Sequence, residues 1–259
     1  MITRASSTRL VSLALSIVLA PLGLALAPAG VRAAARPARG TAAQPRSAQP
    51  QEPAVIDLLV ELLAAGTSPE RAISALAALA KLGDARGLEA AELYALHRRP
   101  EIRLNAVKAL AAIADPRAVA PLVDRLGDDS ADVRAAAATA LAERHEASAA
   151  PRLLRLVRRG DIGAAAPLGR LATPDTLADL REQQGGIKDD VLAAALGSSL
   201  RRDDIGDGVR IDTLKVIGKL HGVEATAAIA DYLASIPARD NRASRREAQR
   251  LLDERGGER

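Results

Sequence analysis

Residues 99–126 read RPEIRLNAVKALAAIADPRAVAPLVDRL, and the chain repeats this pattern on both sides. At an offset of 31 residues, the segment 69–88 matches the segment 100–119, so that Leu79 corresponds to Leu110. At the same offset Arg103 corresponds to Arg134, and at an offset of 107 residues Arg103 corresponds to Arg210. A fixed period of roughly 30 to 45 residues is typical of a solenoid, whose units bury their apolar faces against one another. The sequence therefore predicts a stack of similar units.

Each unit is predicted to be a pair of helices, A followed by B. Ile102, Ala106, Ala109 and Ile113 lie on one face of a helix at about 100° per residue. Asp115 is then typical of an N-cap, with proline at the first helical position after it. We expect A and B helices at 53–65 and 69–82, 85–98 and 100–114, 116–126 and 131–144, 148–158 and 162–171, and 174–183 and 188–200. A B helix from residue 209, a last A helix that contains Tyr232 and a polar terminal helix at 242–254 should follow.

Two segments are predicted to be degenerate copies. In the B helix at 162–171, Gly163 stands near the arginine position, and Pro167 and Gly169 follow inside the helix. Such a helix should be short, kinked or frayed, and could bend the stack. After residue 200 the turn at 201–208 leads directly into a B-like helix, so one A helix should be lost or reduced to a loop.

These features resemble the HEAT repeats, in particular the bacterial short type that is also found in phycobilisome lyases. The matching features are the Asp-rich opening of helix B at 128–134, the Asp-Pro-Arg-Ala-Val at 115–119, and prolines at Pro121 and Pro151 where the family has a helix kink. The resemblance covers residues 53–255. It implies an all-α, right-handed α-solenoid of about six helix pairs, one or two of them degenerate. It does not imply a single activity, because proteins with this solenoid include scaffolds, adaptors and a few enzymes.

The first 33 residues are predicted to be a secretory signal peptide. Arg4 and Arg9 precede an apolar run at 10–27, and cleavage is expected after Ala33. Residues 34–52 are then expected to be a disordered Ala/Pro/Arg-rich tether, and residues 53–259 are expected to form the solenoid. The alternative for the leader is an uncleaved membrane anchor, because about 18 apolar residues just span a bilayer. We expect an exported protein, periplasmic or extracellular; the absence of cysteine is compatible with either.

The charge balance argues against nucleic acid as the partner. Six of the 36 basic residues and none of the 32 acidic residues precede residue 52, so the solenoid carries a net charge of −2. A nucleic-acid-binding domain should show a net basic footprint. The chain also has no Phe and no Trp with which to stack bases. A DNA-binding solenoid therefore remains a lesser alternative.

No catalytic motif, cofactor site or metal site is expected. His97, His145 and His221 occur singly near predicted helix ends, where a cation is favourable. The acidic turn at 203–208 lacks the ligands of a calcium loop, with Ile205 at position 3 and Leu214 at position 12. Asp207 is expected to cap the next helix. The sequence thus predicts a non-enzyme, the alternative being an enzyme subunit of the HEAT-repeat lyase type.

Three arginines recur near the start of helix B, namely Arg103, Arg134 and Arg210. The resemblance implies a structural ladder, in which each arginine binds a carboxylate between the helices, such as Asp128, Asp129 or Asp132. Bidentate arginine–carboxylate geometry suits this role. The alternative is a row of anion-binding arginines.

Helix B is also where a partner protein or peptide is expected to bind, because the resemblance implies that B helices line the concave side. The candidate residues are Leu104, Asn105 and Lys108, Thr139 in the next unit, and Ile211, Asp212 and Lys215. The alternative is that Leu104 and Ile211 are buried between neighbouring B helices. The sequence therefore predicts an exported scaffold or adaptor with no bound cofactor.

Overall fold

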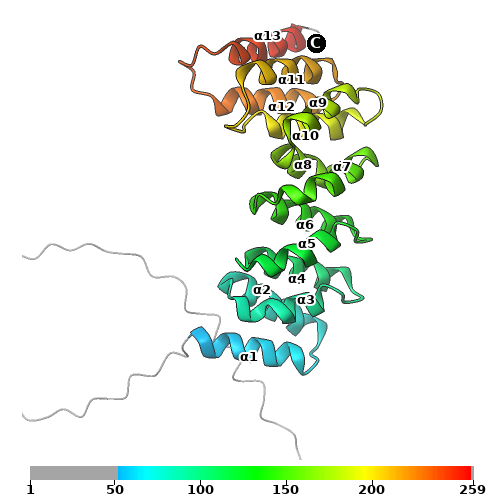
Figure 1. Cartoon of the computed structure of the whole chain (residues 1–259), viewed down its shortest axis with the longest axis vertical. Helices are drawn as coiled ribbons and strands as arrows, with labels where there is room; N and C mark the ends of the chain where they lie inside the picture. Colours follow the sequence, from blue (N-terminus) through cyan, green and yellow to red (C-terminus); the bar gives the residue numbers. More distant parts are fainter. Residues whose placement is uncertain (1–51, 258–259) are drawn as a thin grey trace, which may run out of the picture. The chain divides into compact units, whose positions relative to one another are not determined.

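The computed structural model describes residues 52–257, which fold as thirteen α-helices and four short 3-10 turns (Figure 1). No strand occurs in this part of the chain. The A helices are α1 (Glu52–Ala64), α3 (Leu88–Tyr94), α5 (Val119–Arg125), α7 (Ala150–Arg158) and α9 (Pro174–Glu182). The B helices are α2 (Pro69–Leu82), α4 (Pro100–Ala112), α6 (Ala131–Glu143), α8 (Ala165–Leu171) and α10 (Asp189–Ser199). The last three are α11 (Asp207–Lys219), α12 (Val223–Ser235) and α13 (Ala243–Gly257). The predicted leader and nearly all of the tether lie outside the described residues.

The B helices form a continuous row, in which α2 packs on α4, α4 on α6, α6 on α8 and α8 on α10. Each A helix packs on its own B helix. The core between them is aliphatic: Leu76, Leu110, Leu141 and Leu168 are completely buried. Because each unit shares its buried face with the next, the units stabilise one another rather than folding alone. The predicted all-α solenoid is confirmed, and none of the described helices is long and apolar enough to cross a membrane.

The last helix pair differs from the prediction. Helix α12, not α11, is the main neighbour of α10 in the B row, and α13 covers both α11 and α12 (Figure 1). Helix α11 therefore takes the place of an A helix, although its sequence matches that of α4. No A helix is lost, and the expectation of a missing one was wrong. The alternation of A and B positions continues because each new helix must cover the apolar surface left open by its predecessor.

The prolines that the sequence placed in the middle of A helices lie next to a junction between a 3-10 turn and an α-helix. Each of α3, α5 and α7 is preceded by a 3-10 turn, namely η1 (Ala85–Gly87), η2 (Pro116–Ala118) and η3 (Ala147–Ala149). Pro121 and Pro151 then lie in the first turn of α5 and α7, where a backbone N–H has no helical acceptor to lose. Helix α3 has the same junction with Ala90 in the place of Pro121. The prolines are thus tolerated at the junction and do not cause it.

Helix α8 is short, as predicted, at seven residues, but it is not frayed. Leu168 and Ala165 are completely buried, and a side chain at Gly169 would collide with the Ala195 carbonyl of α10. A Cβ on Gly197 of α10 would likewise lie 2.6 Å from the Cβ of Ala228 in α12. These glycines let successive B helices approach closely, and the row continues through α8.

Candidate functional site

The arginine at the start of helix α4 connects two successive A–B turns. Arg103 donates to both carboxylate oxygens of Asp128, with Nε–Oδ2 at 2.8 Å and Nη2–Oδ1 at 2.7 Å. Its Nη1 donates to the carbonyls of His97 and Arg98, at 3.0 and 3.2 Å. The carbonyls belong to the turn before α4, whereas Asp128 belongs to the turn before α6. One guanidinium therefore fastens its own unit to the next, and we call this arrangement a rung.

A second rung starts from Arg134 of α6. Its Nη1 donates to the carbonyls of Asp128 and Asp129, at 2.8 and 3.1 Å, and its Nε donates to Oδ2 of Asp161 at 2.6 Å. The carboxylate is thus Asp161 of the next turn, which the sequence analysis did not name. Asp129 contributes only its carbonyl. Asp132 is exposed and joins no rung within the described residues, since it lies about 200° around the helix from Arg134.

The third predicted rung is incomplete. Arg210 donates to the carbonyls of Leu200, at 3.0 Å, and Arg202, at 2.6 Å, but to no carboxylate in the described part of the chain. This corrects the expectation for Arg210. The physical reason is the position of α11, which does not stack in the B row, so the next A–B turn does not lie beside this guanidinium.

The electrostatics of the Arg103 rung are those of a structural ion pair. The side chain of Asp128 is 3% exposed and that of Arg103 is 14% exposed. Burial alone would raise the pKa of Asp128, but hydrogen bonds from Arg103 and from the Ser130 N–H, with the charges of Arg103 and Arg125, hold this pKa below its usual value. The pair is therefore ionised near neutral pH, and its donors and acceptors are used within the fold.

A second set of arginines, which sequence reasoning missed, reaches backward along the stack. Arg125 donates to the carbonyl of Ala95 at 3.0 Å, and Arg144 donates to those of Ile113 and Asp115 at 2.6 and 2.7 Å. Arg202 and Arg255 bind the carbonyls at the ends of α8 and α11 in the same way. Carbonyls at a helix C-terminus have no intrahelical donor, so these bonds satisfy them. The only sequence signal is an arginine about 30 residues after an earlier helix end.

The predicted partner-binding residues divide into two groups. Leu104, Asn105 and Lys108 of α4 lie beside Thr139 of α6, on the surface that the B row presents to solvent, which we call the B face. Lys108 is exposed, Asn105 donates to the carbonyl of Glu101 at 2.8 Å, and Leu104 is half-buried against the core.

The other predicted group does not continue this surface. Ile211, Asp212 and Lys215 lie on α11, which is outside the B row. Asp212 and Lys215 form an exposed ion pair at 4.0 Å. These three residues are therefore not part of the B face.

A shallow groove of about 240 Å³ continues the B face across α8, α10 and α12. Its floor is made of small residues, among them Ala166, Ala194, Gly197 and Ala228. Arg201, Glu224 and Asp231 stand at its edges, all exposed, and none of their side chains has a hydrogen bond or ion pair within the described residues. Sequence reasoning missed the groove because close helix packing, and not a motif, creates it.

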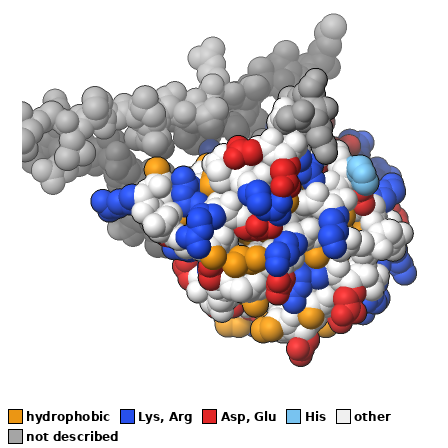
Figure 2. All heavy atoms as spheres, turned by 90° about the horizontal axis from the view of Figure 1, so that it is seen from above, with side chains coloured by type: hydrophobic (Ala, Val, Ile, Leu, Met, Phe, Trp, Pro, Cys, Tyr) orange, Lys and Arg blue, Asp and Glu red, His pale blue; other side chains and the backbone are white. Residues whose placement is uncertain are grey.

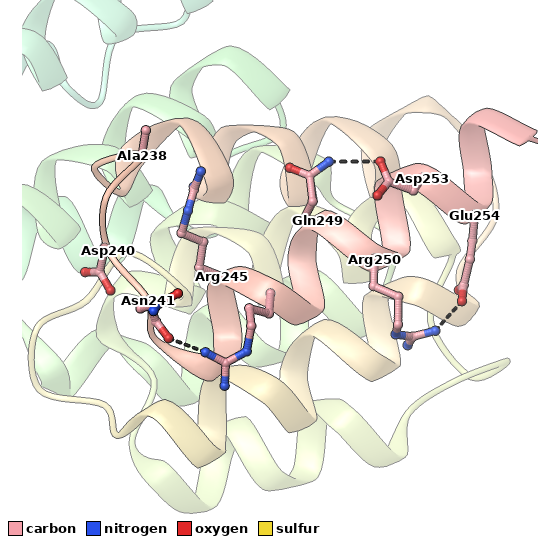
Figure 3. A pocket seen from close by; sticks show the side chains of 9 residues that line it. Ala238, Asp240, Asn241, Arg245, Gln249, Arg250, Asp253 and Glu254 are labelled. Carbon is pink, nitrogen blue, oxygen red and sulfur yellow. Dashed lines mark hydrogen bonds and ion pairs between the residues drawn. The ribbon is translucent and has the colours of Figure 1, made fainter.

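The hollow at the outer face of α13, of about 460 Å³, has a different character (Figure 3). Gln249 donates to Asp253 at 2.9 Å, and Arg250 pairs with Glu247 at 2.6 Å and with Glu254. Viewed from the C-terminal end, basic and acidic side chains are interspersed over the surface (Figure 2). Charges that pair with one another in this way form a polar end cap for the stack.

No group of three or more His, Cys, Asp or Glu able to hold a metal ion occurs among residues 52–257. The acidic turn is used internally: Asp204 pairs with Arg202, and Asp207 accepts from the backbone N–H of Ser244 at 3.2 Å and from its hydroxyl. Asp207 is the first residue of α11 and caps the start of α13, which corrects the expectation that it caps its own helix. His221 contacts Asp189, with Nδ1–Oδ2 at 3.1 Å.

Comparison with known proteins identifies the repeat. The family model of HEAT repeats matches residues 56–142 and 88–166. The two matches together cover residues 56–166, which are similar to HEAT repeats. No curated protein is significantly similar to the chain in sequence.

The solved structures to which this chain is similar include the complex of CpcE and CpcF of phycocyanin lyase from Nostoc sp. PCC7120. It shares 16% identity, covers 83% of this chain and 99% of that chain, and has a TM-score of 0.41. Two engineered proteins share 20% and 22% identity, cover 78% and 76% of this chain and 96% and 97% of their own, with TM-scores of 0.40 and 0.39. These likenesses are too distant to say anything about function.

Proposed function

We propose that this protein is an exported, non-catalytic scaffold that binds a partner protein or peptide on its B face. The observation that carries the proposal is a contrast in charge pairing. Lys108, Arg201, Glu224 and Asp231 on the B face have no side-chain partner in the described residues, whereas the rungs and α13 use their charges internally. Unpaired charges beside small and half-buried apolar residues are what a partner's polar and apolar groups require.

The form of the B face favours an extended segment. Leu104 offers apolar surface, Lys108 and Arg201 offer donors, and Glu224 and Asp231 offer acceptors along one row of helices. The shallow groove, about 240 Å³, is small for a drug-sized ligand, whose pockets run from roughly 300 to 1,000 Å³. A peptide that crosses several B helices could contact the apolar, donor and acceptor groups of the B face at the same time.

Site-specific photo-crosslinking tests the binding surface. A photoreactive amino acid is placed at Asn105, Thr139 or Ala227 on the B face, and at Arg155 of α7 as the control on an A helix. We expect discrete adducts of one size from the three B-face positions and none from Arg155. Adducts of equal yield from position 155, or none from any B-face position, would rule the surface out.

Export is tested separately by sequencing the N-terminus of the protein isolated from cells. The proposal requires a mature chain that begins at Ala34. An intact chain that keeps Met1 and remains in the cytoplasm would contradict export, while leaving the binding surface untouched.

A further inference from the structure

The first unit of the solenoid has no rung. At the offset of 31 residues, Ala72 stands in the place of Arg103, and His97 stands in the place of Asp128. Both the guanidinium and the carboxylate are therefore replaced at the same interface. Ala72 is 1% exposed and lies in the first turn of α2, so the backbone of the rung position is retained while its side chain is absent.

An open cleft of about 390 Å³ occupies this position. It lies between the α1–α2 turn and the end of α3, and its lining includes Gly66, Thr67, Ala72, Leu93, Tyr94 and His97. The Tyr94 and His97 rings are stacked, with centroids 6.1 Å apart and planes 7° apart, and they form one wall. The Tyr94 hydroxyl donates to the Leu63 carbonyl at 2.8 Å, and His97 Nδ1 accepts from the Arg99 N–H at 3.1 Å, so both rings are held in place.

The backbone acceptors of the missing rung are still present. Arg103 and Arg134 each bind the carbonyls of the residues six and five positions before them. For position 72 these are the carbonyls of Gly66 and Thr67; both residues line the cleft, and their carbonyls have no donor among the described residues, although Gly66 has a positive φ of 70° that its counterparts His97 and Asp128 do not share. The counterparts of these two carbonyls in the next units bind a guanidinium. Here the carbonyls have no hydrogen-bond donor, and they lie beside an apolar and aromatic wall.

We propose that this cleft receives an arginine side chain from a partner protein, which completes the first rung in trans. The guanidinium donates to the carbonyls of Gly66 and Thr67 and stacks on the Tyr94–His97 wall, a geometry that suits its planar fork. Its aliphatic stem lies along the cleft, while Leu93 and Leu96, which are 64% and 69% exposed, contact apolar residues that flank the arginine. The site lies at the edge of the first two units and is separate from the B face.

The charge at the rim is balanced and does not by itself select a cation. Arg99 interacts with Glu70, whose pKa is lowered first by a hydrogen bond from its own backbone and then by Ser68. Recognition therefore rests on the two carbonyls and the aromatic wall. Arg71, beside the empty position, is exposed on another side of α2 and its side chain has no contact there in the described structure. We therefore assign the occupant to a molecule outside the described helices.

Fluorescence anisotropy on the full chain tests the proposal with a labelled peptide, Gly-Leu-Arg-Leu-Gly, and its citrulline counterpart, which has the same shape without the charge. We expect the citrulline peptide to bind roughly ten-fold more weakly or worse, since charge-assisted bonds are about twice as strong as neutral ones. Ala72→Arg should abolish binding, because the chain then fills its own rung. Ser74→Arg, which adds the same charge one half-turn away, should leave the affinity unchanged.

Two further variants keep the test decisive. Leu93→Ser changes an exposed side chain at the wall, so it should fold normally and weaken binding several-fold. The triple substitution Arg36→Gln, Arg39→Gln and Arg46→Gln removes all three arginines of the predicted tether and should not alter affinity. Equal binding of the arginine and citrulline peptides, or full binding by folded Ala72→Arg, would overturn the proposal. Tighter binding after the tether substitutions would show that the chain's own arginine is the occupant, and would overturn the assignment to a partner.

Discussion

The interface between the first and second units and the interface between the second and third units both have an apolar core, but they differ in their polar edge. Leu79 of α2 and Leu110 of α4 occupy equivalent positions and are 1% and 0% exposed. At the edge, Arg103 and Asp128 close one interface, whereas Ala72 and His97 leave the other open. The stacking of the units therefore depends on the apolar faces, and the rung is an addition that one unit can lack. Where it is absent, donors and acceptors become available to another molecule.

The largest expected effect concerns the core that the two interfaces share. Leu79→Ala and Leu110→Ala should each lower the free energy of unfolding by about 3 kcal/mol, through lost burial and the cavity that remains. The measurement is urea unfolding followed by circular dichroism. A loss at Leu79 of less than half that at Leu110 would show that the first unit is not packed into the stack like the second.

Removing a rung should cost less than removing a core leucine. Arg103→Ala leaves the buried Asp128 carboxylate with Ser130 and the more distant Arg125, 3.6 Å away, and should lower the free energy of unfolding by about 2 kcal/mol. The matched control is Arg250→Ala on α13. Its side chain is 51% exposed, so its loss should leave the free energy of unfolding almost unchanged. Equal losses in the two variants would contradict a structural role for the rung.

The rung also makes stability depend on pH. Since the folded pKa of Asp128 is below its unfolded value, its ionisation stabilises the fold above the unfolded pKa, and this contribution is lost as pH falls through the folded pKa. The difference in unfolding free energy between the wild type and Asp128→Asn should therefore be constant near neutral pH. It should shrink only below about pH 4. A difference that changed between pH 6 and 8 would mean that another group titrates.

The smallest expected effect is a gain in stability from rebuilding the rung between the first and second units. Ala72→Arg combined with His97→Asp rebuilds the Arg103–Asp128 geometry and should raise the free energy of unfolding by about 1 kcal/mol. Differential scanning calorimetry would record this as a higher melting temperature. A net loss in the double variant, with Ser74→Arg unaffected, would indicate that the cleft lacks the shape of a rung.

The sequence predicts what repeats and misses what breaks the repeat. The spacing of apolar residues located the helices within a few residues, and the resemblance gave Asp128 as one of three candidate carboxylates for the ladder, without assigning it to Arg103. Asp161 was missed because it lies 27 residues after Arg134, whereas Asp128 lies 25 after Arg103. Helix α11 was misplaced because A and B helices both need one apolar face, so its likeness to α4 does not determine its row.

Other features leave little trace in a sequence. Gly169 was interpreted as a helix breaker, although it serves close packing on α10. The backward-reaching arginines, such as Arg144, bind backbone carbonyls, which any residue type provides. The groove and the cleft arise where side chains are small. The missing guanidinium at Ala72 can be recognised only by comparison with the equivalent positions Arg103 and Arg134, where the guanidinium is present.

The most direct measurement is nuclear magnetic resonance of the backbone carbonyl carbons during titration with the arginine peptide. The account predicts shifts at Gly66 and Thr67, unchanged signals at Asp128 and Asp129, whose carbonyls Arg134 already binds, and no shifts with the citrulline peptide. Shifts confined to the B face, around Lys108 and Arg201, or no shifts at Gly66 and Thr67 while the peptide binds, would contradict it.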